Sequence, residues 1–182
     1  MYETSRPFSV RTAHTAQLTP AELAAIRALL VDAFDGDFGD EDWDHALGGM
    51  HCAVYGADGD PVAHGSVIMR RVMRGERWYR VGYVEAVAVH PGVRRRGLGG
   101  RVMEELEGIV ARGYDFGALS ASDEGAALYR SRGWRLWPGR IEGLGPRGPV
   151  RFPDEEESTF VRGAVPGAGE SLVFDQRNGD IL

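Results

Sequence analysis

Hydrophobic residues recur along the chain at the two spacings that distinguish helices from strands. Apolar residues three or four positions apart predict amphipathic helices, at residues 20–34, 98–113 and 123–133. Thr19 and Glu22 have the spacing of a capping box, and Pro20 suits the first helical position. The first helix is therefore expected to begin at Pro20.

Runs rich in β-branched and aromatic residues predict strands. Three such runs lie between residues 51 and 90, divided by turn signals at Asp58-Gly59 and at Gly75, and they predict an antiparallel meander. Shorter strand-like runs follow at 116–121, 134–137, 158–164 and 171–175. Strands and helices then alternate, which indicates an α/β sheet of mixed direction. Residues rich in glycine and charge predict loops, at 35–49 and 138–157.

The composition fits one folded domain spanning residues 1–182. An apolar content of 43% over 182 residues is enough to build a core. The net charge is −6, from 21 basic and 27 acidic residues, which argues against nucleic-acid binding and favours a cationic partner. The sequence has no apolar run of about 18 residues, so we expect neither a membrane segment nor a signal peptide.

Scarce residue types exclude several classes of chemistry. The chain contains no lysine, which excludes a Walker P-loop and a pyridoxal Schiff base. Cys52 is the single cysteine, so no intramolecular disulfide is expected and the cytoplasm is the expected compartment. Cys52 and the five histidines lack the spacing of metal ligands, so we expect structural histidines and no metal.

A turn of unusual composition joins the predicted strand at 83–91 to the helix at 98–113. Three arginines, at 94–96, precede glycines at 97, 99 and 100. The unpaired amides of a helix's first turn attract anions, glycine lets phosphate oxygens approach the backbone, and arginine supplies paired donors. A phosphate-binding turn is favoured over a tight connection with solvated arginines. The glycine spacing differs from that of the dinucleotide fingerprint G-x-G-x-x-G.

The stretch "RRRGLG", Arg94 to Gly99, resembles the R/Q-x-x-G-x-G/A motif of the GCN5-related N-acetyltransferase (GNAT) superfamily. This resemblance implies the GNAT fold, an α/β structure with a mixed, mostly antiparallel central sheet flanked by helices. It also implies acetyl-coenzyme A (acetyl-CoA) as acetyl donor and coenzyme A as product. The backbone implied to pair with the pantetheine arm, like an added strand, is that of Val87, Ala88 and Val89. The residues implied around the pyrophosphate are Arg94, Arg95, Arg96, Gly97, Leu98, Gly99 and Gly100.

Several segments resemble a narrower family, the aminoglycoside 2′-N-acetyltransferases. They are "AFDGDFGDEDWDHALGGMH", "GYVEAVAV", "GALSAS" and "LYRSRGW", in the same order along the chain. The resemblance implies acetylation of the 2′-amino group of a polycationic aminoglycoside, and with it antibiotic resistance. We also expect a homodimer, without a nucleic-acid or membrane partner.

An aminoglycoside carries several ammonium groups, so its site should be rich in carboxylates. Six acidic residues crowd residues 35–44, and a polycation would relieve their mutual repulsion. A merely solvated acidic loop fits the same pattern. The residues that the resemblance implies in acceptor binding are Asp37, Asp42, Glu85, the backbone of Ala86, Ser120, Asp154, Glu155, Asp180 and the terminal carboxylate of Leu182.

Acetyl transfer needs a base for the amine and an acid for the departing thiolate. The resemblance implies that Glu85, in an apolar strand, is the base acting through water. It implies Tyr129 as the acid. No covalent intermediate is expected, because the amine attacks the thioester directly and Cys52 has no evident base partner.

Two alternatives stay open. Ala86 stands where the family has a glycine, and the chain ends in Leu182 where related sequences end in an aromatic residue. These departures leave room for another polyamine or amino-sugar acceptor. A non-catalytic acyl-CoA sensor is the second alternative, although the presence of both Glu85 and Tyr129 argues against it.

Three further large residues, Met69, Met73 and Trp78, are expected in the core or at a dimer surface.

Overall fold

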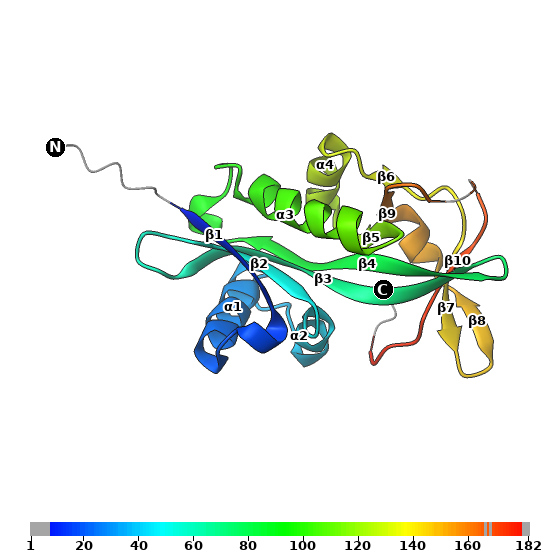
Figure 1. The fold of residues 1–182 in the computed structure, drawn as a ribbon, viewed down its shortest axis with the longest axis horizontal. Helices are drawn as coiled ribbons and strands as arrows, with labels where there is room; N and C mark the ends of the chain where they lie inside the picture. Colours follow the sequence, from blue (N-terminus) through cyan, green and yellow to red (C-terminus); the bar gives the residue numbers. More distant parts are fainter. Residues whose placement is uncertain (1–7, 166, 168, 180–182) are drawn as a thin grey trace. The chain divides into compact units, whose positions relative to one another are not determined.

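The computed structural model describes residues 8–165, 167 and 169–179, which form alternating strands and helices (Figure 1). The strands are β1 (Ser9–His14), β2 (Met50–Tyr55), β3 (Pro61–Arg74), β4 (Arg77–Val89), β5 (Phe116–Ser120), β6 (Arg135–Leu136), β7 (Ile141–Gly145), β8 (Gly148–Arg151), β9 (Thr159–Arg162) and β10 (Leu172–Phe174). The α-helices are α1 (Pro20–Ala33), α2 (Asp40–Ala46), α3 (Leu98–Gly113) and α4 (Asp123–Ser131). Short 3-10 helices are η1 (Thr15–Gln17), η2 (Pro91–Val93) and η3 (Pro153–Glu157).

The predicted helices and strands are confirmed, including the start of α1. The Thr19 hydroxyl accepts the Glu22 amide, and the Glu22 carboxylate accepts the Thr19 amide at 2.7 Å. The pairs β4–β5 and β7–β10 are parallel, and the other pairs of known register are antiparallel. The expected mixed, mostly antiparallel sheet is therefore confirmed.

Two predicted loops were wrong. Residues 35–49 contain helix α2, which has three acidic residues in its first turn. Their negative charges stabilise the helix, because its N-terminus is the positive end of the helix dipole. Its Asp42 carboxylate also accepts the Gly39 amide at 2.7 Å. Residues 138–157 contain β7, β8 and η3, because a tight turn at Gly145–Gly148 lets the two short strands pair. Glycine and charge in these segments belong to turns and caps between regular elements.

The described contacts divide the chain into two compact units, each built from two stretches of sequence. The first comprises Met1–Ile68 and Glu85–Leu106, and the second comprises Met69–Val84 and Glu107–Leu182. Strands β3 and β4 and helix α3 each contribute residues to both units. One domain spanning residues 1–182 stays a prediction.

In the first unit, helices cover both faces of the strands. Helices α1 and α2 lie on one side of β2 and β3, and the first turns of α3 lie on the other (Figure 1). On the α1 side, Ile26 and Leu30 pack against Ala53 and Ala88. On the α3 side, Gly65 faces Val102 and Leu106 so closely that a Cβ there would lie 2.9 Å from each side chain. Helix α3 therefore rests directly on the backbone of β3.

The second unit has its own aromatic core. Buried side chains from β4, β5 and β10 meet there, among them Tyr79, Tyr83, Phe116 and Phe174. Two of the large residues expected in the core or at a dimer surface are exposed, since Met69 and Trp78 have 48% and 44% of their surface accessible.

Candidate functional site

Strand β4 loses its parallel partner halfway along its length. The ladder to β5 comprises Val81–Tyr83, and none of the described residues extends that pairing further. The backbone edge at Val87–Val89 is therefore left without a strand partner on that side. Such an edge suits an extended ligand that adds itself as a strand, as predicted for the pantetheine arm.

Ala86 interrupts β4 with a left-handed backbone conformation. Its φ is 49°, and among the described residues it is the one non-glycine residue inside a strand with positive φ. This conformation costs a residue with a Cβ roughly 1–2 kcal/mol. Glu85, Ala86 and Val87 are all half-buried. The predicted base and the predicted acceptor-binding backbone thus lie at an irregular point of the strand.

Two buried histidines, His51 and His64, form a hydrogen-bonded series between Ala86 and Thr15. His64 Nδ1 lies 3.0 Å from the Ala86 carbonyl oxygen, and His64 Nε2 lies 3.0 Å from His51 Nδ1. His51 Nε2 lies 2.7 Å from the Thr15 hydroxyl. Burial lowers the pKa of His51 to about 4 and that of His64 to about 3. Both rings are therefore neutral near pH 7, which agrees with the prediction of structural histidines.

The arginine-glycine turn lies between strand β4 and helix α3, as predicted, and the short helix η2, which was not predicted, precedes it. Arg95 and Gly97 both have positive φ, 63° and 76°. Arg94 donates Nε to the Val89 carbonyl at 3.2 Å and a terminal nitrogen to the Ala33 carbonyl at 3.0 Å. These bonds tie the turn to the end of α1. Arg94 therefore shapes the turn, while the exposed Arg95 and Arg96 point no donor at a described carboxylate.

The predicted acidic acceptor residues of the first unit flank the start of α2. Asp37 lies in the segment before the helix, and Asp42 lies in its first turn. Both are exposed, and neither forms an ion pair with a cation among the described residues, whereas Asp40 pairs with Arg27. Among the described residues nothing occupies the Asp37 carboxylate, whereas Asp42 uses one oxygen to cap α2.

The second unit brings together two of the predicted acceptor residues. Ser120, at the end of β5, donates its hydroxyl to Glu155 Oε2 at 2.8 Å. Ser158 donates to the same oxygen at 2.8 Å, and this residue was not predicted. The neighbouring Asp154 is exposed on η3. Glu155 Oε2 is thus held by two hydroxyls, so the carboxylate has a defined orientation.

Tyr129, the predicted acid, lies in α4 of the second unit. Its side chain is buried, with 7% of its surface accessible. The ring packs against Trp134 and Phe160 at centroid distances of 6.3 and 6.4 Å. Trp134 in turn donates its indole N–H to the buried Glu107 at 2.9 Å. The ring of Tyr129 is therefore fixed by aromatic packing.

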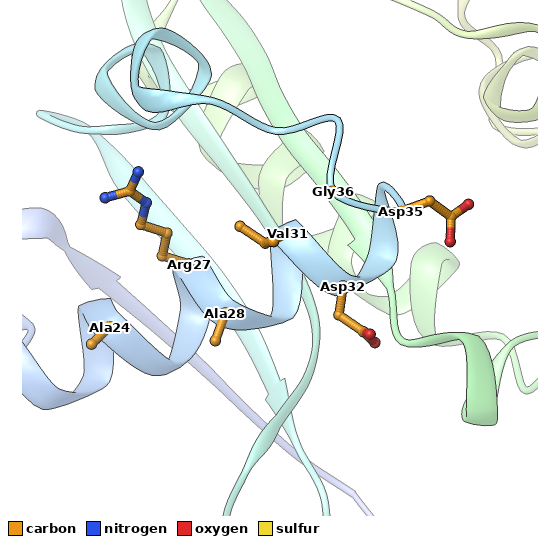
Figure 2. A pocket seen from close by; sticks show the side chains of 7 residues that line it. All are labelled: Ala24, Arg27, Ala28, Val31, Asp32, Asp35 and Gly36. Atoms are coloured by element: carbon orange, nitrogen blue, oxygen red, sulfur yellow. The ribbon is translucent and has the colours of Figure 1, made fainter.

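A surface hollow of about 710 Å³ opens along α1 (Figure 2). Its lining residues come from α1 and the turn that follows, and they are Ala24, Arg27, Ala28, Val31, Asp32, Asp35 and Gly36. Figure 2 shows Ala24 and Asp35 at opposite ends of this row. None of the predicted site residues lines the hollow.

Two predicted site residues, Asp180 and Leu182, lie outside the described residues. Within the described part of the chain, no three metal-type side chains gather into a possible metal site. None of the helices there combines the length and the apolar content that a membrane crossing requires.

A family model and a curated relative both match this chain. The model of the acetyltransferase (GNAT) domain matches residues 14–137. An aminoglycoside 2′-N-acetyltransferase of Mycolicibacterium fortuitum is 40% identical over 179 residues, covering 95% of this chain and 91% of that protein. The chain belongs to the GNAT acetyltransferase family. The resemblance to aminoglycoside 2′-N-acetyltransferases is therefore confirmed.

Solved GNAT structures share the fold at low sequence identity. The GNAT family N-acetyltransferase YhbS of Escherichia coli, in complex with CoA, has a TM-score of 0.69 at 18% identity. The match covers 95% of this chain and 94% of YhbS. A GNAT acetyltransferase of Brucella melitensis in complex with acetyl-CoA has a TM-score of 0.60 at 16% identity, covering 91% and 94%. Eis1 of Mycobacterium abscessus has a TM-score of 0.59 at 19% identity. The match covers 74% of this chain and 33% of Eis1.

Proposed function

We propose that this GNAT enzyme transfers the acetyl group of acetyl-CoA to the 2′-amino group of aminoglycosides and thereby confers resistance to them. The observation that carries the proposal is the 40% identity over 95% of the chain to an aminoglycoside 2′-N-acetyltransferase. Two carboxylates support a polycationic acceptor: that of Asp37, which has no ion-pair partner among the described residues, and that of Glu155, which two hydroxyls orient.

The chain's residues suit the substrate acetyl-CoA at two places. The unpaired edge at Val87–Val89 offers amide and carbonyl groups to its pantetheine arm. The positive φ of Gly97 and the start of α3 suit its pyrophosphate, with Arg95 and Arg96 as exposed donors. Arg94, Leu98, Gly99 and Gly100 complete the turn in this proposal.

In the proposed reaction the acceptor nitrogen attacks the thioester carbon, a C–N bond forms and the C–S bond breaks. Glu85 receives the proton of the amine through a water molecule, and the Ala86 backbone lies beside the acceptor. Tyr129 gives its phenolic proton to the departing thiolate. The products are the N-acetylated amine and coenzyme A with a free thiol.

The experiment is a panel of acceptors mixed with acetyl-CoA and read by free-thiol release. We expect release with aminoglycosides that carry a 2′-amino group and none with matched compounds that carry a 2′-hydroxyl. Activity confined to peptides or neutral amines would contradict the proposal. Binding of acetyl-CoA without thiol release from any amine would favour the acyl-CoA sensor.

The turn is tested by comparing two glycine variants of the same helix. Gly99→Leu should weaken acetyl-CoA binding, because a side chain would occupy the path of the phosphates. Gly113→Leu is the control, since a Cβ at the far end of α3 would meet no atom within 4 Å. Equal dissociation constants for the two variants, measured by calorimetry, would contradict the assignment.

The homodimer and the cytoplasmic location also belong to this proposal. The exposed Met69 and Trp78 support a contact between two copies through that part of the second unit. Light scattering coupled to size exclusion tests the dimer, and Trp78→Ser should shift the mass toward that of a monomer if this surface forms the contact.

A further inference from the structure

Ala86 keeps its unfavourable backbone conformation although nothing in its own side chain favours it. A single Ala inside a strand would normally return to extended geometry, because positive φ brings its Cβ against the backbone. The other non-glycine residues with positive φ, Asp35 and Arg95, lie in turns, where such geometry is common. An external contact must therefore hold Ala86.

The hydrogen bond from His64 supplies that contact. His64 has no accessible surface, and its Nδ1 lies 3.0 Å from the Ala86 carbonyl oxygen. A carbonyl can only accept, so Nδ1 carries the proton and donates. Because the ring is neutral, Nε2 has a lone pair and must accept.

The direction of the remaining bonds follows from this one. His51 Nδ1 donates to His64 Nε2 at 3.0 Å, which leaves His51 Nε2 as an acceptor. The Thr15 hydroxyl donates to it at 2.7 Å and itself accepts the Gly48 amide at 2.9 Å. Every member of the series has a partner, and each ring has one permitted tautomer.

The strand register explains why these two rings meet. His51 on β2 pairs with Ser66 on β3, and His64 lies two residues before Ser66, so the rings are diagonal neighbours on one face. Ala53 is directly opposite His64 and belongs to the core beneath α1. The pair is thus enclosed by packing on the α1 face, where His51 has 1% of its surface accessible.

We propose that His64, oriented by His51 and Thr15, is a positioning residue that holds the Ala86 peptide in its left-handed conformation and so fixes Glu85 and the Val87–Val89 edge for acetyl transfer. His64 acts through Ala86 and contacts no substrate. This inference rests on the proposed function, since Glu85 and that edge are its base and its thioester-binding backbone. The relevant property is the geometry of one peptide in β4.

The test uses the different reach of two amides. In His64→Asn, the side-chain NH₂ takes the place of Nδ1 and can still donate to Ala86. In His64→Gln, the longer side chain places the amide near the position of Nε2, and His64→Leu has no donor. We expect His64→Asn to keep kcat within about threefold, and the other two to lose about ten- to a hundredfold, as misplaced reacting groups do. KM for the acceptor should change little, because its carboxylates are untouched.

A second arm separates positioning from packing. Glycine adopts positive φ freely, so Ala86→Gly in the His64→Leu background should recover about tenfold in kcat relative to His64→Leu alone. A variant that is merely unstable would not recover in this way. Near-ultraviolet circular dichroism identifies the variants that keep native packing.

Coenzyme A binding by calorimetry, with no amine present, decides the inference independently of the acceptor. We expect weaker binding for His64→Leu and His64→Gln, and wild-type affinity for His64→Asn. If no amine is acetylated but these affinities follow the expected order, the proposed function fails and the positioning role stands. Wild-type kcat and affinity in His64→Leu would overturn the inference. Equal damage in the Asn and Leu variants without recovery by Ala86→Gly would also overturn it.

Discussion

Glu107 and Trp134 are joined by a buried hydrogen bond of 2.9 Å, from the indole N–H to Oε1. Arg132 adds two more bonds to the same carboxylate, at 2.9 and 2.8 Å, and Arg162 lies 3.6 Å from it. One carboxylate of α3 therefore organises the end of α4 and the tryptophan against which Tyr129 packs. Removing one member of a buried ion pair destabilises the fold, because the remaining charge is left without its counter-charge.

Glu107→Gln should lower the free energy of unfolding by roughly 3 kcal/mol, because Arg132 loses its buried counter-charge. Glu104→Gln on the same helix is the control. Glu104 is exposed, so the change there should stay within about 0.5 kcal/mol. Urea denaturation measures both, and equal midpoints for the two variants would contradict the structural role of Glu107.

The buried histidine pair predicts a specific loss of stability in mild acid. The pKa values of about 4 for His51 and about 3 for His64 lie below the ordinary value of 6.5, because burial disfavours the charged rings and His14 and His51 add repulsion. Between pH 6.5 and about 4 the unfolded chain therefore binds more protons than the folded chain. Stability should fall as the pH is lowered, by about 1.4 kcal/mol per pH unit for each histidine.

Urea unfolding at several pH values between 7 and 5 checks this slope. His64→Asn should show a shallower dependence on pH, since it lacks one of the two titrating groups. Parallel slopes for His64→Asn and the wild-type protein would show that His64 is not buried in the neutral form.

Sequence reasoning found the elements whose signals are local. The capping box of Thr19 and Glu22, the turn at Gly75 and the spacing of α3 each depend on residues close together in the chain. Helix α2 was missed because seven residues rich in Asp give little apolar periodicity, and its stability comes from caps and charge placement. The strands β7 and β8 were missed because their glycines and charges resemble those of a loop.

The candidate site was predictable where a motif carries it and not where distant residues meet. The turn at residues 94–100 follows from its own composition. The series Thr15, His51, His64 and Ala86 depends on strand register, and the one signal in the sequence was a pair of histidines inside apolar β-rich runs. The bond from Ser120 to Glu155 likewise needs the fold, because it joins residues 35 positions apart.

Substitution of Asp37 should change KM for the acceptor and leave KM for acetyl-CoA unchanged. Asp37→Asn removes a carboxylate without an ion-pair partner among the described residues, so KM for the aminoglycoside should rise about tenfold while KM for acetyl-CoA stays constant. Added salt should reproduce part of the effect by screening. Asp58→Asn, in the exposed turn between β2 and β3, is the matched control. A parallel rise for both variants would indicate a general loss of negative charge.

Removal of the Tyr129 hydroxyl should lower kcat and leave coenzyme A binding unchanged. Tyr129→Phe keeps the ring that packs against Trp134 and Phe160 but removes the phenolic proton. We expect kcat to fall roughly ten- to ten-thousandfold, the range for loss of an acid catalyst, with coenzyme A affinity unchanged. Single-turnover kinetics excludes masking by slow product release. A wild-type rate in that assay would reduce Tyr129 to a packing residue.

The position of the acetyl group on the product decides whether this enzyme is a 2′-N-acetyltransferase. The wild-type enzyme is incubated with acetyl-CoA and an aminoglycoside that carries amino groups at the 2′ position and elsewhere, and the product is analysed by mass spectrometry and two-dimensional NMR. We expect one added acetyl group, with the amide at the 2′ nitrogen. An acetyl group at any other position, or unmodified aminoglycoside after prolonged incubation, would contradict it.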